Sequence, residues 1–128
     1  MRELIINAIN EWLQNNHDNP DNGWQSLFLE FMRDNGLGVE NAKSIDDIIE
    51  NIGYEDSYQV FQQLVLVPLK NQESFFIGSC SKGLFVVVSE TDAKKASEFY
   101  MSRINSEKRH LDNLEKVMRN YGIEIDND

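Results

Sequence analysis

The stretch that decides the fold is Phe76-Ile-Gly-Ser-Cys-Ser-Lys-Gly-Leu-Phe-Val-Val-Val88, in which two apolar runs flank a small polar segment. Runs rich in β-branched and aromatic residues that are joined by a few small polar residues are typical of a β-hairpin. Glycines and a lysine could also form a phosphate loop, and a lone cysteine could be a nucleophile. Three interpretations therefore compete for this segment.

A phosphate-binding loop has a lysine followed by Ser or Thr at the start of a helix, whose amides point at the phosphate. Lys82 is instead followed by Gly83 and a strand-forming run. A nucleophilic Cys80 would need a nearby base, and sequence places neither His17 nor His110 beside it. We therefore favour a hairpin with a flexible polar tip.

Helices are predicted on both sides of the hairpin. Apolar spacing indicates helices over residues 2–15 and 24–34, the second ending at a left-handed Gly36. Later helices have their own start and stop signals. The predicted elements are a helix from Ser44 to Gly53, a helix from Ser57 that Pro68 ends, strands at 75–77 and 84–88, and a long helix from Ser89-Glu-Thr-Asp92 to Gly122.

The predicted fold class is α+β and mainly helical, with one β-hairpin and a long C-terminal helix. A chain of 128 residues with 41% hydrophobic content is long enough to bury one core. We expect a single domain over 1–122, with a helical N-terminal part at 1–40 and a core at 44–122. The acidic segment 123–128 is expected to be a flexible tail.

Composition also restricts the function. The N-terminal residues have no continuous apolar stretch, so we expect a cytoplasmic protein without a membrane segment. The single cysteine excludes an intramolecular disulfide. The net charge of −10 opposes indiscriminate nucleic-acid binding, but residues 1–56 carry three bases against twelve acids, whereas residues 70–122 carry nine bases against seven acids. Any anion should therefore bind the C-terminal half.

The loop Asp18-Asn-Pro-Asp-Asn-Gly23 has a calcium-loop start, but Pro20 and Leu29 stand where ligands are required. We interpret it as a solvated turn. A metal-dependent hydrolase that uses Asp18 or Asp21 is the least favoured function, and no metal or cofactor is expected.

The long last helix carries an apolar stripe that only Glu107 interrupts. Its residues follow alternating four- and three-residue steps, as in a coiled coil. They are Tyr100, Ile104, Leu111, Leu114, Met118 and Tyr121. The stripe can pack on the first helix of the same chain, which we favour, or on a second copy in a homodimer.

A short helix, a tight turn, a second helix, a hairpin and a closing helix follow the order of a winged helix-turn-helix. Residues 44–121 resemble the winged-helix modules found in phage and prophage proteins. The resemblance lies in Ile77-Gly-Ser-Cys-Ser-Lys-Gly-Leu-Phe85, in Ser89-Glu-Thr-Asp92 and in the helix that follows. It implies recognition of DNA or protein without catalysis.

In the DNA-reading members of that family the recognition helix usually carries Arg or Lys, and residues 57–67 contain neither. On a helical wheel Val60, Phe61, Leu64 and Val65 share one side, and Gln59, Gln62, Gln63 and Leu66 share the other. Glutamine can pair with adenine in the major groove, although the amides can also simply be solvated. The predicted DNA-binding residues are Gln59, Gln62, Gln63, Lys70, Ser79, Ser81 and Lys82.

Two functions therefore remain open. One is a winged-helix protein that binds double-stranded DNA, as a dimer or within a complex. The other is an acidic adaptor or inhibitor that binds a basic surface of another protein. The predicted protein-interaction residues are Asp46, Asp47, Tyr100, Ile104, Leu111, Leu114 and Met118.

Overall fold

The computed structural model describes residues 1–125. The chain divides into two compact units, Met1–Ala96 and the part from Ser97 onward, and the boundary lies inside helix α6 (Glu90–Asn120). The fold is α+β and mainly helical, with one antiparallel hairpin and a long C-terminal helix, as predicted. Of the expected tail 123–128, residues 126–128 lie outside the described residues.

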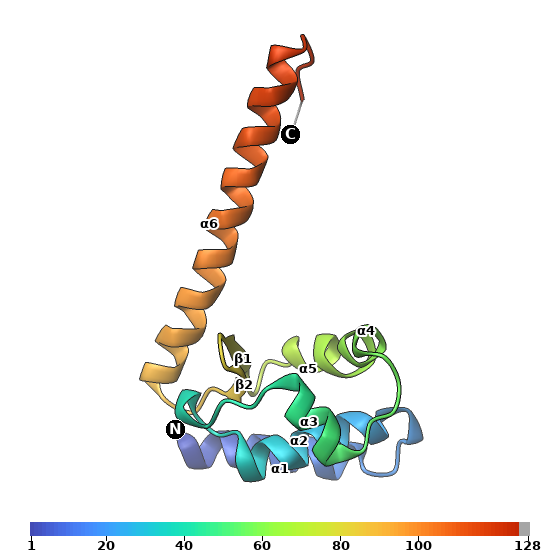
Figure 1. Ribbon diagram of the computed structural model, residues 1–128. Helices are drawn as coiled ribbons and strands as arrows, with labels where there is room; N and C mark the ends of the chain where they lie inside the picture. Colours follow the sequence, from blue (N-terminus) through green and yellow to red (C-terminus); the bar gives the residue numbers. More distant parts are fainter. Residues whose placement is uncertain (126–128) are drawn as a thin grey trace. The chain divides into compact units, whose positions relative to one another are not determined.

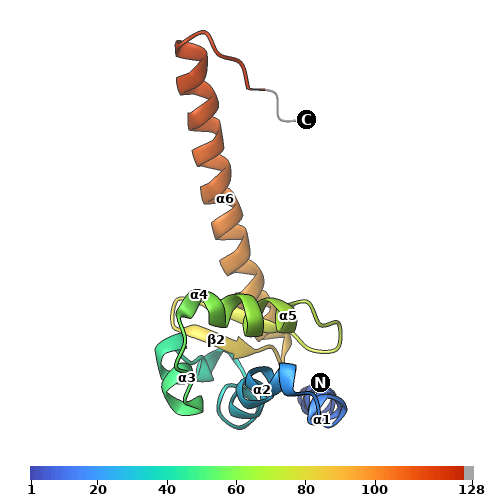
Figure 2. The same cartoon turned by 90° about the vertical axis from the view of Figure 1, so that its right-hand side faces the viewer.

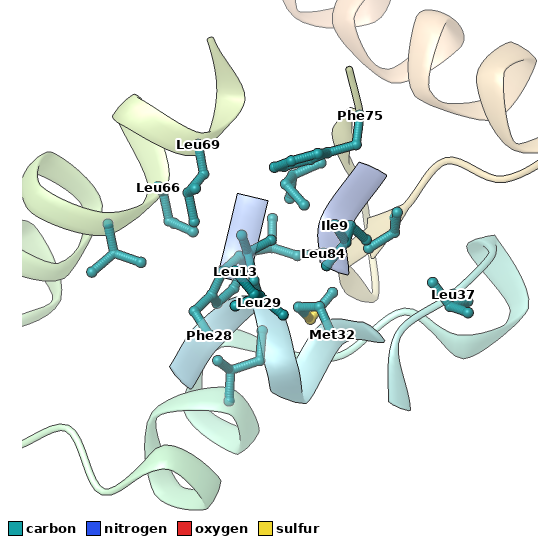
Figure 3. Packing of buried hydrophobic residues seen from close by; sticks show 14 of the residues in the cluster. Ile9, Leu13, Phe28, Leu29, Met32, Leu37, Leu66, Leu69, Phe75 and Leu84 are labelled. Carbon is teal, nitrogen blue, oxygen red and sulfur yellow. The ribbon is translucent and has the colours of Figure 1, made fainter. Parts of the chain in front are cut away.

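The first unit begins with the two predicted helices, α1 (Arg2–Asn16) and α2 (Gly23–Asn35). A short 3₁₀ turn, η1 (Pro20–Asn22), joins them. Both place apolar stripes in one core, as Figure 3 shows for Ile9 and Leu13 of α1 and Phe28 of α2. Figures 1 and 2 show α1 and α2 on one side of this unit and α4 and α5 on the other, and in Figure 2 strand β2 lies between the two pairs of helices.

Gly36 ends α2, but it is not the left-handed cap that we predicted. Its φ is −121°, and its N–H donates to the Met32 carbonyl at 2.8 Å. A side chain at this position would bring Cβ within 2.5 Å of Met32 Cε. A larger residue at position 36 would therefore require the Met32 side chain to shift, whereas the backbone conformation itself does not call for glycine.

The hairpin is formed by β1 (Ile77–Cys80) and β2 (Gly83–Val86), with Cys80 opposite Gly83. The predicted strands 75–77 and 84–88 were displaced, because Gly78, Ser79 and Cys80 belong to a strand and not to a loop. Only Ser81 and Lys82 form the turn. Gly83 has a φ of 135°, and a side chain there would collide with the Lys43 carbonyl. The tip is therefore much shorter than its composition suggested.

A third segment covers the other edge of β2. The β2 residue Leu84 exchanges two hydrogen bonds of 2.8 Å with Lys43, and Val86 bonds to Gly36 and Gly38 at 2.8 and 2.9 Å. The 3₁₀ turn η2 (Val39–Asn41) lies between these contacts. This segment was missed in the sequence because its two bridges are isolated and do not form a continuous alternating strand.

Two helices follow with the predicted caps. Helix α3 (Ile45–Ile52) begins at Ser44, whose Oγ accepts a bond from the Asp47 N–H, and ends at a left-handed Gly53 with a φ of 73°. Helix α4 (Tyr58–Phe61) begins at Ser57, whose Oγ accepts from the Val60 N–H. Serine caps and a glycine end are thus local signals that the fold preserves.

The fourth helix does not stop at Pro68, as we had predicted. It continues from α4 through a π-helical segment, η3 (Gln62–Leu66), into α5 (Val67–Lys70). A proline in a helix cannot donate to the carbonyl four residues earlier. The wider turn, in which the Val67 N–H donates to Gln62 O, carries the chain past this defect.

A buried carboxylate connects three parts of the first unit. Asp92, in the first turn of α6, is 2% exposed. It accepts from the Val39 N–H at 2.9 Å and the Val88 N–H at 3.0 Å, while its own N–H donates to Ser89 Oγ at 3.1 Å. The predicted Ser89 cap is therefore confirmed. The Asp92 carboxylate of the same cap also holds the segment 36–44 in place through Val39.

We expect Asp92→Ala to lower the free energy of unfolding by roughly 2 to 4 kcal/mol, because two buried backbone amides lose their acceptor. Urea denaturation measures this loss. Asp112→Ala, at an exposed position of the same helix, is the control and should change stability little. Equal effects of the two substitutions would contradict the role given to the Asp92 carboxylate.

Candidate nucleic-acid interface

The outer face of α4, η3 and α5 carries the predicted glutamines. Gln59, Gln62 and Gln63 are all exposed, and with Leu64 they line a shallow open depression. We call this surface the glutamine face. Three apolar side chains that the sequence did not assign to a site are also exposed along this helix, namely Tyr58, Leu64 and Val67.

The π-helical turn explains why the helical wheel misplaced two leucines. Leu64, predicted to be buried, is 61% exposed, whereas Leu66, predicted to be outside, is 2% exposed. One additional residue in a turn rotates everything that follows by about 100° around the helix axis. The apolar face after Leu64 is consequently formed by Val65, Leu66 and Leu69.

Gln25 supports this turn from the neighbouring helix α2. Its Nε2 donates to the Leu64 carbonyl at 2.8 Å, and the side chain is buried. Leu64 is four residues before Pro68, so its carbonyl is the one that the proline leaves without a helical donor. A proline within a helical run was the available signal that such a donor is required.

Aromatic packing fixes the start of the same helix. Tyr54, in the turn between α3 and α4, packs edge to face on Phe61 and on Trp24, each with ring centroids 5.0 Å apart. Burial raises the pKa of the Tyr54 hydroxyl, and the charge of Asp56 raises it further. The glutamine face is thus carried by a helix that is anchored in the core.

The hairpin tip lies beside the start of this helix. Ser81 and Lys82 are exposed, and an open depression of about 340 Å³ is lined by the tip, by Tyr58 and by residues 44–46 at the start of α3. The structure thus brings predicted DNA-binding residues of the tip together with the acidic Asp46, which we had assigned to a protein surface.

Two predicted DNA-binding residues contact each other. Ser79 is buried, at 9% exposure, and its Oγ accepts from Lys70 Nζ at 3.3 Å. Lys70 is itself half-buried. Ser79 pairs with Leu84 in the strand ladder and does not lie at the tip, and its contact with DNA stays a prediction.

The charge around the glutamine face is mainly negative. Asp46, Asp47, Glu55 and Asp56 are all exposed near the starts of α3 and α4. Cations are fewer, with Lys82 at the tip and Lys94 and Lys95 exposed in the first turns of α6. Such a surface can hold a polyanion only through a few contacts.

In the second unit the predicted stripe is exposed. Ile104, Leu111, Leu114 and Tyr121 are 42–77% exposed, and Tyr100 and Met118 are half-buried. Helix α1, which we had favoured as its partner, already buries Ile9 and Leu13 in the core of the first unit. We had paired the stripe with α1 because each helix needed a partner for its apolar side chains. Helix α1 already has such a partner within the first unit, so this argument no longer holds.

Residues 1–125 contain no group of three or more His, Cys, Asp or Glu side chains arranged to hold a metal ion. Within the same residues, no helix combines the length and apolar character needed to cross a bilayer.

Comparison with known proteins gives one relative. The chain is 30% identical over 96 residues to the "Putative control protein C.MjaVP" of Methanocaldococcus jannaschii. The alignment covers 72% of this chain and 58% of that protein, so the chain spans little more than half of the relative's length. No protein-family model matches the chain. No solved structure matches it either.

We expect Gln25→Leu to destabilise the first unit by roughly 1 to 2 kcal/mol, since it leaves the Leu64 carbonyl unpaired. Gln14→Leu, at an exposed site on α1, is the matched control. A Pro68→Ala background restores a backbone N–H at position 68. In that background Gln25→Leu should lower the free energy of unfolding by a smaller amount. An unchanged loss in that background, measured by urea denaturation, would mean that Gln25 does not compensate for the proline.

Proposed function

We propose that this protein is a non-enzymatic regulator that binds double-stranded DNA through a winged helix-turn-helix. The observation that carries the proposal is the order of elements in the first unit. An edge segment at 36–44, which pairs with β2, comes first. It is followed by α3, a tight turn, the anchored helix with the glutamine face, and the hairpin. In a winged helix the helix before the hairpin is the recognition element, and the hairpin is the wing.

The relative supports this proposal. Its printed name is that of a putative control protein, and a helix-turn-helix regulator of that kind fits the module described above. The resemblance of residues 44–121 to phage and prophage winged-helix modules indicates the same class, which recognises a partner without catalysis. A regulator also agrees with the exposure of Gln59, Gln62 and Gln63, since amide side chains can read adenine by two hydrogen bonds.

In the proposed interface, base edges and phosphates would be contacted by different residues. Gln62 and its neighbours would read base edges, whereas Lys82 at the tip, with Lys94 and Lys95, would contact phosphates. The exposed Leu64 and Val67 suit contact with thymine methyl groups in the same groove. Because few cations are present, we expect weak binding that is lost quickly as salt increases.

We expect the protein to bind a random-sequence duplex at low salt in fluorescence anisotropy, and Lys82→Ala to weaken binding to all sequences alike. Loss of one phosphate contact should reduce the slope of log affinity against log salt by about one. Gln62→Ala should instead reduce discrimination among sequences selected from a random pool.

Lys116→Ala and Gln14→Ala are the controls, as exposed residues of the same types outside the proposed interface. Absence of duplex binding at low salt would reject the DNA proposal.

The acidic surface favours a second candidate, an adaptor that binds a basic protein. Asp46 and Asp47 are exposed in the first turn of α3, next to the depression below the hairpin tip. Attraction between opposite charges would direct a basic partner to this side.

The double charge reversal Asp46→Lys and Asp47→Lys separates the two candidates. We expect it to strengthen duplex binding, because it removes two negative charges near the phosphates. For the adaptor, the same change should release a basic protein captured from the source cell. Loss of the captured protein without any duplex binding by the parent protein would favour the adaptor.

A further inference from the structure

We propose that the exposed stripe of α6 is the dimer interface of this protein, and that two copies pair through it in antiparallel orientation. The stripe begins after the boundary of the first unit, follows α6 to Met118 and ends at Tyr121, in the turn directly after the helix. An exposed apolar row this regular requires a partner surface with the same spacing, which a second copy supplies.

The spacing of α6 defines the positions that face a partner. Ile104, Leu111 and Met118 occupy one core position of each heptad, and Tyr100, Leu114 and Tyr121 occupy the other. Phe99, which lies outside this row, is instead covered by its own chain, because the Arg103 guanidinium lies 5.9 Å from its ring centroid.

Two charge contacts oppose a parallel pair. Glu107 falls at a core position, so a parallel pair would place it directly against Glu107 of the second copy. Arg103 and Lys108 fall at the flanking positions that meet across a parallel interface. Both contacts join like charges, and each occurs where water is partly excluded.

An antiparallel pair removes both conflicts. When Leu111 lies opposite Leu114 of the second copy, Ile104 meets Tyr121, and Glu107 meets Met118 instead of another acid. The flanking positions then place Lys108 near Glu115 of the second copy, and the symmetry of the dimer produces this contact twice.

Charge also fixes the register of the antiparallel pair. Sliding one helix by a heptad in one direction places Lys108 against Lys108, and in the other direction it places Glu115 against Glu115. Only the register with Leu111 opposite Leu114 combines apolar layers with opposite charges at the flanks.

Cysteine cross-linking tests the orientation. Two variants are made in a Cys80→Ser background, one with Leu111→Cys and one with Leu114→Cys. Each variant is oxidised alone, and an equal mixture of the two is oxidised in parallel. We expect a disulfide mainly in the mixture, at least about tenfold more than in either chain alone, since disulfides need Cβ atoms roughly 4 Å apart. Efficient cross-linking of each chain with itself would overturn the antiparallel orientation.

Charge reversal tests the interface by sedimentation equilibrium of the full chain. Lys108→Glu and Glu115→Lys should each raise the dimer dissociation constant about tenfold, and the double variant should recover most of the affinity. Lys116→Glu, on the outer side of the helix, is the matched control. In a parallel dimer Lys108→Glu would strengthen association by relieving its contact with Arg103.

Glu107→Leu should strengthen the dimer, because it replaces a charge in an apolar row. This variant keeps the proposal falsifiable if the natural dimer is weak. A protein that stays monomeric at all concentrations, with and without Glu107→Leu, would overturn the proposal and indicate that another surface covers the stripe.

Discussion

The first unit depends on the carboxylate of Asp92. Its two oxygens accept from backbone amides more than fifty and only four residues away, at Val39 and Val88. These bonds hold the segment beside β2, the end of the hairpin and the start of α6 in one arrangement. A buried carboxylate is costly unless it is well hydrogen-bonded. Asp92 therefore stabilises this arrangement of the junction and disfavours any arrangement that leaves its carboxylate without these bonds.

The hairpin depends on that junction for its position. An isolated two-stranded hairpin is marginal in water. Here β2 has a neighbour on each edge, because Leu84 and Val86 hydrogen-bond to the segment 36–44, whereas the other edge of β2 pairs with β1. Packing against Phe28, Leu66 and Phe75 then fills the space between the helices and the sheet (Figure 3). The exposed turn at Ser81 and Lys82 is short because the rest of the hairpin is required for this core.

Local signals predicted the elements well and the long-range contacts poorly. Ser44, Gly53, Ser57 and Gly122 mark helix ends in the sequence, and each acts through atoms a few residues away. Asp92 was recognisable as part of a cap, but its bond to Val39 depends on tertiary structure. The position of Ser79 was missed for a similar reason, because small polar residues suit a buried strand as well as a loop.

The candidate site was misread at one point, where the backbone departs from regular geometry. A wheel drawn at 100° per residue cannot anticipate a π-helical turn, so it exchanged the positions of Leu64 and Leu66. Gln59 precedes this turn, and Gln62 and Gln63 are its first two residues, so all three remain exposed. Pro68 cannot donate to the Leu64 carbonyl, and Gln25 Nε2 donates to it instead. In this turn the Leu64 side chain is exposed next to the glutamine amides. The exposed Leu64 and Val67 beside the three glutamines therefore give this face its mixed polar and apolar character.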